Sequence, residues 1–304
     1  LKNLEAKKET LNAFKNLLIM RDAKYLIGGR MSYFYRIGEL LRNDYCVNLQ
    51  DNSKLAIEYC YKDEKKYNIN LSKNISNFIN RSLNLKEYKN TFLDKNRVVV
   101  KNFLNKETSL SIKKELDSFP WWVYAIRNHK SNTPLYFNMG VDISKNLEEC
   151  EISNANNNFT YRFKRYTGGH YTSCYCCCCR LEETLKSYDF ISSLESITGL
   201  KRLIPNEVNI AYYSKGDFIN IHADQDKGDI AITLSFTDEW RPNYGGILHF
   251  LDDDMNIIES LVPSLSTLCI FRIIEARSYH FVSPVTVDKN RYVISAWYSE
   301  NKDF

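Results

Sequence analysis

The 304-residue sequence has no apolar run that approaches the length of a membrane span, which argues against a helical membrane protein. Its first residues, Leu1 to Leu4, carry a charge and no apolar core, so they are not typical of a signal peptide. There is no internal repeat, and the only biased tracts are an asparagine run and a cysteine run. With 44% hydrophobic and 26% charged residues, the composition is that of a globular protein.

The nine cysteines do not form the pattern of a disulfide-rich protein. Five of them lie between positions 174 and 179, and adjacent cysteines are poor disulfide partners because the bond requires separated, facing Cβ atoms. We therefore expect a reducing, cytoplasmic location. A run of four soft ligands also fits a structural zinc site: His170, Cys174, Cys176 and Cys179. The alternatives are a reduced, partly buried cysteine cluster and a thiol-rich lip near an active site.

Positive charge is concentrated in the first third of the chain. Residues 1–95 contain 18 Lys+Arg and 11 Asp+Glu (18 − 11 = +7), whereas the remaining residues contain 23 and 26 (23 − 26 = −3). Apolar residues recur at helical spacing between residues 4 and 18 and again between residues 31 and 42. We therefore expect residues 1–95 to form a helix-rich basic accessory domain that docks an acidic partner, with a solvated basic face as the alternative.

The pattern changes near residue 96, after a segment at 86–96 that we expect to be a polar linker. Val98, Val99 and Val100 predict a short strand, and strict alternation in residues 159–165 predicts another. Residues 106–118 predict a helix with Thr108 as its N-cap, and residues 182–198 predict a second helix.

Eight further strands are expected in the last third, at residues 208–213, 217–222, 229–236, 246–250, 256–261, 267–271, 279–283 and 291–298. Turn residues separate them, and no helix lies between them. This spacing favours a jelly roll or cupin-like double-stranded β-helix. The predicted fold is therefore α+β with a mainly β core and flanking helices, in which residues 96–304 form the jelly-roll domain and residues 1–95 the helix-rich domain.

A His-x-Asp pair, His222 and Asp224, is followed by His280 after 58 residues (280 − 222). Residues two apart on a strand face the same side, and the facing sheet can bring His280 across. Two imidazoles and one carboxylate can bind one face of iron(II) and leave the opposite face open. The alternative for each histidine is a hydrogen-bonded structural imidazole, which is how we interpret His129 and His249.

Arg291 begins the last predicted strand, 11 residues after His280 (291 − 280). A guanidinium at the floor of a barrel can bind a carboxylate through two hydrogen bonds in a site closed to water. Iron(II) oxygenases with this ligand set need a co-substrate that supplies two electrons, and an α-keto acid does so. Its distal carboxylate then requires a fixed cation, and Arg291 fits that role.

The sequence from about residue 97 to residue 300 resembles the 2-oxoglutarate and iron(II)-dependent dioxygenases, most closely those of the prolyl hydroxylase type. The motifs that carry the resemblance are Tyr213-Ser-Lys-Gly216 ahead of His222-Ala-Asp224, Gly245-Gly246-Ile-Leu-His-Phe250, Pro263-Ser264 ahead of Leu268-Cys-Ile-Phe271, His280-Phe-Val-Ser-Pro284-Val, and Arg291-Tyr292 before Trp297. Residues 1–95 show no such resemblance.

The resemblance implies that three side chains bind iron: His222, Asp224 and His280. It implies that four others surround 2-oxoglutarate: Arg291 on the distal carboxylate, Tyr213 as a hydrogen-bond partner, and Thr233 and Ser295 as polar lining. Because halogenating relatives replace the carboxylate ligand with a small residue, the aspartate favours hydroxylation. The segment at 225–229 is the expected substrate rim.

The function implied is hydroxylation of an unactivated C–H bond of an amino acid, peptide or protein residue, with O2 and 2-oxoglutarate consumed. One alternative is desaturation or cyclisation of a small metabolite at the same iron. Another, of a different class, is a catalytically silent jelly-roll binding or sensor protein.

Overall fold

The structure, a computed structural model, describes residues 78–120, 122–131, 133–166, 177–274 and 277–301, which belong to one compact unit. The predictions for residues 1–77, including most of the helix-rich domain, lie outside these residues, and so do three of the four proposed zinc ligands, His170, Cys174 and Cys176. None of the helices described has the length and apolar character needed to cross a membrane.

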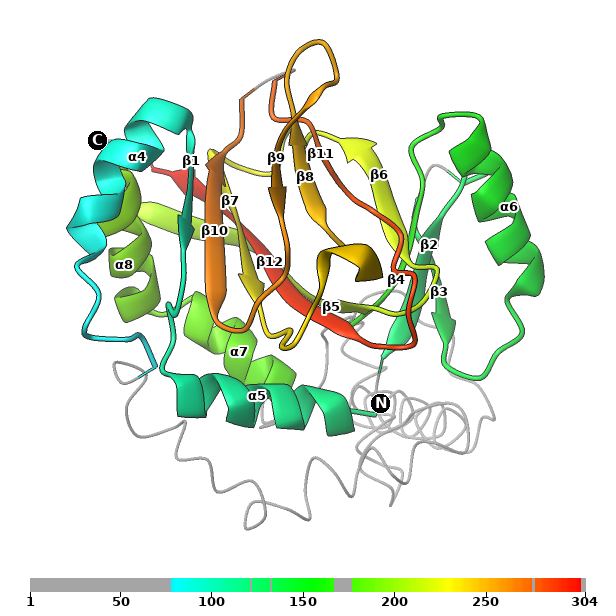
Figure 1. Cartoon of the computed structure of the whole chain (residues 1–304), viewed down its shortest axis with the longest axis horizontal. Helices are drawn as coiled ribbons and strands as arrows, with labels where there is room; N and C mark the ends of the chain where they lie inside the picture. The colour runs from blue at the N-terminus through cyan, green and yellow to red at the C-terminus, as the bar shows by residue number, and fades with distance from the viewer. Residues whose placement is uncertain (1–77, 121, 132, 167–176, 275–276, 302–304) are drawn as a thin grey trace, which may run out of the picture. The chain divides into compact units, whose positions relative to one another are not determined.

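A twelve-stranded antiparallel sheet that curls on itself forms the centre of this unit (Figure 1). Its strands are β1 (Arg97–Val100), β2 (Val123–Arg127), β3 (Leu135–Asn138), β4 (Tyr161–Arg165), β5 (Leu203–Tyr213), β6 (Phe218–His222), β7 (Ile230–Ser235), β8 (Leu248–Leu251), β9 (Ile257–Leu261), β10 (Thr267–Arg272), β11 (His280–Val282) and β12 (Arg291–Glu300). The strand order is β1-β10-β7-β12-β5-β4-β6-β11-β8-β9, and β2 and β3 branch from β4.

The two ends of this strand order are joined by side chains. Arg97 on β1 donates from Nε to Glu259 on β9 at 2.6 Å, and its guanidinium carbon lies 4.2 Å from the ring centre of Phe250 on β8. Phe250 in turn makes an edge-to-face contact with Phe271 on β10 at 5.2 Å between ring centres. The sheet is therefore a curled half-barrel, consistent with the predicted double-stranded β-helix.

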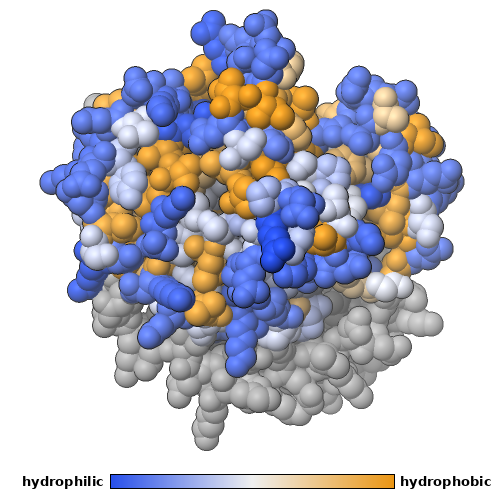
Figure 2. All heavy atoms as spheres, in the orientation of Figure 1, coloured by the Kyte–Doolittle hydropathy of each residue, from blue (hydrophilic) through white to orange (hydrophobic). Residues whose placement is uncertain are grey.

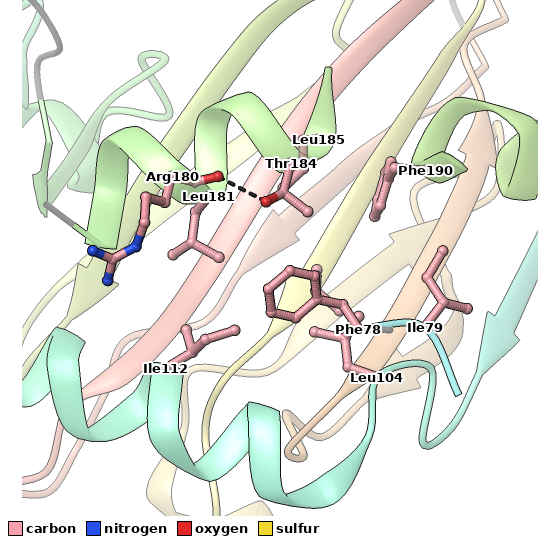
Figure 3. Close-up of a pocket in the computed structure, with 10 residues that line it drawn as sticks. Phe78, Ile79, Leu104, Ile112, Arg180, Leu181, Thr184, Leu185 and Phe190 are labelled. Atoms are coloured by element: carbon pink, nitrogen blue, oxygen red, sulfur yellow. Dashed lines mark hydrogen bonds between the residues drawn. The ribbon is translucent and has the colours of Figure 1, made fainter. Parts of the chain in front are cut away.

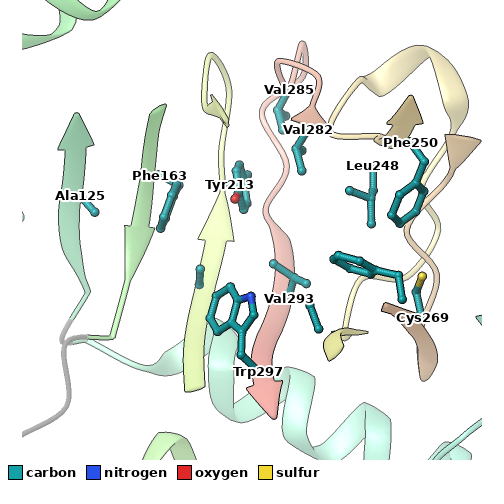
Figure 4. Close-up of a cluster of buried hydrophobic side chains, with 13 residues drawn as sticks. Ala125, Phe163, Tyr213, Leu248, Phe250, Cys269, Val282, Val285, Val293 and Trp297 are labelled. Carbon is teal, nitrogen blue, oxygen red and sulfur yellow. The ribbon is translucent and has the colours of Figure 1, made fainter. Parts of the chain in front are cut away.

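The inner face of the curled sheet carries alternate residues of each strand, as the two-residue period of a strand requires. Their side chains point toward one another across the half-barrel (Figure 4). The cluster consists of Ala125, Phe163, Ala211, Tyr213, Ala231, Leu248, Phe250, Cys269, Phe271, Val282, Val285, Val293 and Trp297. Burying this apolar surface is the main driving force for curling the sheet.

Within the described residues, five α-helices accompany the sheet: α4 (Tyr88–Lys95), α5 (Lys106–Ser118), α6 (Ser144–Ala155), α7 (Cys177–Leu185) and α8 (Tyr188–Thr198). Short 3-10 turns lie at Leu85–Glu87 and Pro242–Tyr244. Leu234, on the outer face of β7, lines an apolar pocket together with Ile112 of α5, Leu181 of α7 and Phe190 of α8 (Figure 3). The outer face of β7 is therefore covered by helices, which explains why most of this strand is buried on both sides.

Hydrophilic and hydrophobic residues are mixed on the face shown in Figure 2, where hydrophobic patches lie between hydrophilic ones. Exposed large apolar side chains include Met255, Ile257 and Ile258, at the β9 end of the sheet.

The eight strands predicted between residues 208 and 298 are confirmed, with β5 starting earlier, at Leu203. The strand predicted at 98–100 is confirmed as β1, the one predicted at 159–165 is confirmed as the shorter β4, and the helix predicted at 106–118 is confirmed as α5. Strands β2 and β3 and helix α6 were not predicted, because their short, mixed sequences carry no clear period.

Three local predictions are wrong. The single helix expected at 182–198 is two helices, because the side chain of Ser187 accepts a hydrogen bond from the backbone of Phe190 and starts α8 as a new helix. The N-cap of α5 is Asn105 rather than Thr108. The expected linker at 86–96 contains α4, whose Phe92 is completely buried. The domain boundary at 95/96 stays a prediction.

Candidate metal centre

Three predicted ligands come together at one end of the half-barrel. His222 is the last residue of β6, Asp224 follows it, and His280 is the first residue of β11. The antiparallel pairing of β11 with β6 places His280 directly opposite His222. One ligand atom from each of the three lies within 4.8 Å of the others. The register between β6 and β11 therefore brings His280 to His222 and Asp224, although 58 residues separate the two histidines along the chain (280 − 222).

Both histidines present the same ring nitrogen to Asp224. His222 Nε2 lies 3.7 Å from Asp224 Oδ1, and His280 Nε2 lies 3.5 Å from Asp224 Oδ2. The other ring nitrogens, Nδ1, lie 2.8 Å from the carbonyl of Asn220 and 2.9 Å from the carbonyl of Ser278. Because a carbonyl only accepts, each Nδ1 carries the hydrogen, and each Nε2 keeps its lone pair for a metal.

The charge state of the site also suits a divalent cation. Burial, together with the neighbouring His280, lowers the pKa of His222 to about 3, so this imidazole is neutral at physiological pH. Burial opposes ionisation of Asp224, but the neighbouring His280, His222 and Lys227 outweigh it, and the pKa of Asp224 falls below its usual range. A neutral imidazole and a carboxylate are the forms that iron(II) binds.

Arg291, the first residue of β12, is 4% exposed. Its Nε and Nη1 atoms are buried and have no hydrogen-bond partner among the described residues. Burial lowers the pKa of this guanidinium, although an arginine stays charged at physiological pH. A buried cation with unsatisfied N–H groups is costly, so the arrangement fits an anionic ligand.

Gly246 makes room for Arg291. A Cβ atom at Gly246 would lie 3.0 Å from Cδ of Arg291 and 3.0 Å from Cγ2 of Val285, and its φ of +62° is in the left-handed region. Glycine adopts this conformation without the strain that a side chain adds. Packing against Arg291 and Val285 therefore explains why the second residue of the Gly245-Gly246 motif is a glycine.

Three further predicted residues lie on the wall that carries Arg291. Tyr213 pairs with Arg291 across β5 and β12, and burial raises the pKa of Tyr213, which keeps its hydroxyl protonated. Ser295 pairs with Thr233 across β12 and β7. Thr233 and Ser295 are partly exposed in the middle of otherwise buried strands, as expected of the lining of an internal space.

Several side chains near the triad were not predicted as site residues. The ring of Phe159 lies 5.5 Å from that of His222, and the alternation of residues 159–165 could have signalled that this segment faces the interior. Two buried polar atoms on the inner wall, Asn209 Oδ1 and Trp297 Nε1, have no hydrogen-bond partner among the described residues. Lys227, on the predicted rim, lies 3.9 Å from Asp224 Oδ1.

The remaining candidates lie outside the triad. His129 is hydrogen-bonded to Ser153 at 2.6 Å and His249 to Ser260 at 2.8 Å, which agrees with their interpretation as structural. Cys179, the described member of the proposed zinc set, lies 3.1 Å from the Tyr166 hydroxyl.

Comparison with known proteins gives a matching family. A model of the 2OG-Fe(II) oxygenase superfamily matches residues 208–299, which include the triad, Arg291 and the strands that carry them. Among solved structures, an oxidoreductase of the 2OG-Fe(II) oxygenase family from Burkholderia pseudomallei is 11% identical, with a TM-score of 0.50 over 73% of this chain and 93% of that chain. At this identity the likeness concerns the fold.

Two prolyl hydroxylases are also similar at low identity. The enzyme from Trichoplax adhaerens, solved with a hypoxia inducible factor peptide fragment, is 18% identical, with a TM-score of 0.46 over 79% of this chain and 96% of that chain. A prolyl-4-hydroxylase from Pseudomonas putida is 16% identical, with a TM-score of 0.42 over 71% of this chain and 99% of that chain.

Proposed function

We propose that this chain, which belongs to the 2OG-Fe(II) oxygenase superfamily, hydroxylates an unactivated C–H bond of an amino acid, a peptide or a protein residue. The observation that carries the proposal is the pairing of two features inside one half-barrel. His222, Asp224 and His280 converge with free ligand atoms, and Arg291 is a buried cation with unsatisfied donors. The first feature suits iron(II), and the second suits the distal carboxylate of 2-oxoglutarate.

The residues divide into two groups by role. The triad holds the metal, and the two backbone carbonyls at Asn220 and Ser278 fix the orientation of its imidazoles. Arg291 binds the distal carboxylate of the co-substrate, Tyr213 donates a hydrogen bond beside it, and Thr233 and Ser295 line the space between. These four roles are supported by the shared inner wall and by the register of β5, β7 and β12.

Iron(II), 2-oxoglutarate and O2 together supply the oxidising chemistry, in which one oxygen atom enters the substrate and the co-substrate leaves as succinate and carbon dioxide. The protein positions the participants and excludes water. The ring of Phe159 packs beside that of His222. The apolar inner cluster, with Phe271 4.9 Å from His280, keeps the metal side of the half-barrel dry. A dry site strengthens the attraction between Arg291 and a carboxylate.

Succinate formation tests the proposal. The protein, supplied with iron(II), 2-oxoglutarate and O2, is expected to release succinate, and His222→Ala should abolish this release. His249→Ala removes a histidine outside the triad and serves as the matched control. Equal succinate from the unsubstituted protein and His222→Ala, with every substrate offered, would overturn the proposal.

Mass spectrometry of amino acids and peptides then identifies the outcome. A hydroxylated product gains one oxygen atom, whereas desaturation or cyclisation removes two hydrogen atoms. Loss of two hydrogens without oxygen gain would replace hydroxylation by the alternative chemistry at the same iron.

A further inference from the structure

A cluster of charged side chains lies beside the metal centre: Arg165 at the end of β4, Glu207 within β5 and Lys227 between β6 and β7. Arg165 Nη2 lies 3.6 Å from Glu207 Oε1, and Lys227 Nζ lies 3.8 Å from Glu207 Oε2. Lys227 is also 3.9 Å from Asp224 Oδ1 and 3.8 Å from the ring centre of Trp297 on the inner wall. A continuous series of side-chain contacts therefore connects Arg165 to a metal ligand.

Glu207 is held loosely by both cations. Its two contacts are longer than hydrogen bonds, and its side chain is 45% exposed. By comparison, Lys164 on the same strand as Arg165 donates to the buried carboxylate of Asp217 at 2.7 Å. Exposed, long-range ion pairs contribute little stability, so another carboxylate can take the place of Glu207 at low cost.

The guanidinium of Arg165 uses its hydrogen-bond donors only in part. Its side chain is 17% exposed, and its Nε is buried without a hydrogen-bond partner among the described residues. Its guanidinium carbon lies 6.0 Å from the ring centre of Tyr136, which limits its freedom. The Nε and Nη2 edge of a guanidinium is the edge that binds a carboxylate through two parallel hydrogen bonds. Rotation of Glu207 away from Arg165 would present this edge.

Positive charge exceeds negative charge around Glu207. Arg127 lies over Phe159 at 4.9 Å, on the ring that packs beside His222. Three cations, Arg127, Arg165 and Lys227, thus lie near two carboxylates, those of Glu207 and the metal ligand Asp224. This balance attracts an anion to the side of the metal centre where these cations lie.

We propose that Arg165 and Lys227 form a specificity subsite for a carboxylate of the substrate, and that Glu207 occupies this subsite until the substrate displaces it. The proposal rests on the proposed function, because the subsite serves to bring a C–H bond of that substrate to the metal. The substrate class is a carboxylate-bearing amino acid or peptide, in which the group is either a free C-terminus or an acidic side chain.

Paired probes test the subsite on the full chain loaded with Mn(II) and 2-oxoglutarate without O2. N-acetyl-L-proline and N-acetyl-L-prolinamide represent a terminal carboxylate and its amide. N-acetyl-L-glutamate N-methylamide and the corresponding glutamine derivative represent a side-chain carboxylate and its amide. Bound Mn(II) enhances the proton relaxation of a nearby probe, so the titration reports Kd at this site alone.

In at least one pair the acid should bind about tenfold tighter than the amide, as a charge-assisted hydrogen bond predicts. Arg165→Gln should reduce this preference to about threefold or less, since the remaining Lys227 makes a weaker point-charge contact. Glu207→Gln should strengthen acid binding, because the internal competitor loses its charge. Lys130→Gln, which removes an exposed charge paired with Glu149, should leave the preference unchanged.

No acid preference in either pair would overturn the subsite, and so would a preference that survives Arg165→Gln or falls in Glu207→Gln. Thermal unfolding separates these results from failure of the proposed function. If Mn(II) with 2-oxoglutarate does not raise the Tm of the unsubstituted protein, the metal and co-substrate assignment fails, whatever the probes do.

Discussion

Arg291 faces Tyr213 across the β12–β5 ladder, with the guanidinium carbon 5.0 Å from the ring centre. The ring supports the cation from one side and leaves Nε and Nη1 without a hydrogen-bond partner among the described residues. A cation held in this way is prepared for an anion before the anion arrives, which reduces the reorganisation that binding requires.

Arg291→Gln is expected to raise the 2-oxoglutarate concentration needed for half-maximal succinate formation by about 10- to 100-fold, because it removes charge-assisted hydrogen bonds. Steady-state kinetics with varied 2-oxoglutarate measure the change. Arg277→Gln, at an exposed arginine, is the control and should leave the value unchanged. A normal half-saturation value in Arg291→Gln would remove Arg291 from the co-substrate site.

Asp224→Ala should abolish stabilisation by Mn(II), since two neutral imidazoles lack the charge that balances a divalent cation. Thermal unfolding with and without Mn(II) measures the effect, and a chelator should reverse it in the unsubstituted protein. The comparison variant is Asp254→Ala, in the turn between β8 and β9. Undiminished Mn(II) stabilisation in Asp224→Ala would place the metal elsewhere.

Without metal, the protein should lose stability as the pH falls from about 6.5 toward 3. The pKa of His222 is about 3 in the folded chain and near its ordinary value of 6.5 in the unfolded chain. Between these values the unfolded state binds a proton that the folded state excludes, so this contribution is complete above pH 6.5 and declines below it by roughly 1.4 kcal/mol per pH unit.

Urea denaturation at pH 4 to 7 measures this effect, with His222→Gln beside His249→Gln. The pH dependence should flatten in His222→Gln and persist in His249→Gln. If the unsubstituted protein and His222→Gln lose stability in parallel as the pH falls, a group other than His222 causes the loss of stability.

Lys164→Met should destabilise the fold by roughly 3–5 kcal/mol, because it leaves the buried Asp217 carboxylate without its cation. Asp217 also accepts a hydrogen bond from the backbone N of Ser214 at 2.7 Å, so the pair holds the turn that follows Tyr213. Urea denaturation provides the free energy of unfolding. The double variant Lys164→Met with Asp217→Asn should cost less than the sum of the single variants.

Lys186→Met, at an exposed pair with Glu182, provides the contrast. Its cost should be about 0.5 kcal/mol or less, as is usual for surface ion pairs. Similar costs for the two lysine substitutions would mean that the buried pair adds no special stability.

Gly246→Ala should cost more stability than Gly140→Ala and should also weaken 2-oxoglutarate binding. Both glycines have a positive φ, but a Cβ atom at Gly140 meets nothing within 4 Å, whereas one at Gly246 crowds Arg291. The difference in stability loss between the two variants measures the effect of crowding, which typically costs about 1–3 kcal/mol in a packed interior. Urea denaturation and co-substrate titration of both variants measure it, and equal costs would contradict the steric role of Gly246.

Local patterns were sufficient to predict much of the core. Strand periods and turn residues predicted the strands that carry His222, His280 and Arg291, because alternation and turn chemistry are properties of neighbouring residues. Asp224 lies two residues beyond the end of β6. The prediction of one helix at 182–198 is wrong because it also relied on local spacing alone. Its apolar spacing is continuous, and the interruption depends on the capping hydrogen bond made by Ser187.

By itself, the sequence determined which side chains could serve a metal and a carboxylate, and on which strands they lie. The tertiary structure decided which distant residues meet. The contact between Arg165 and Glu207 depends on strand pairing between β4 and β5, and the contact between His222 and His280 depends on the register of β6 and β11. These registers are selected by burial of the whole inner face and by the ladder hydrogen bonds, which no local window of the chain contains.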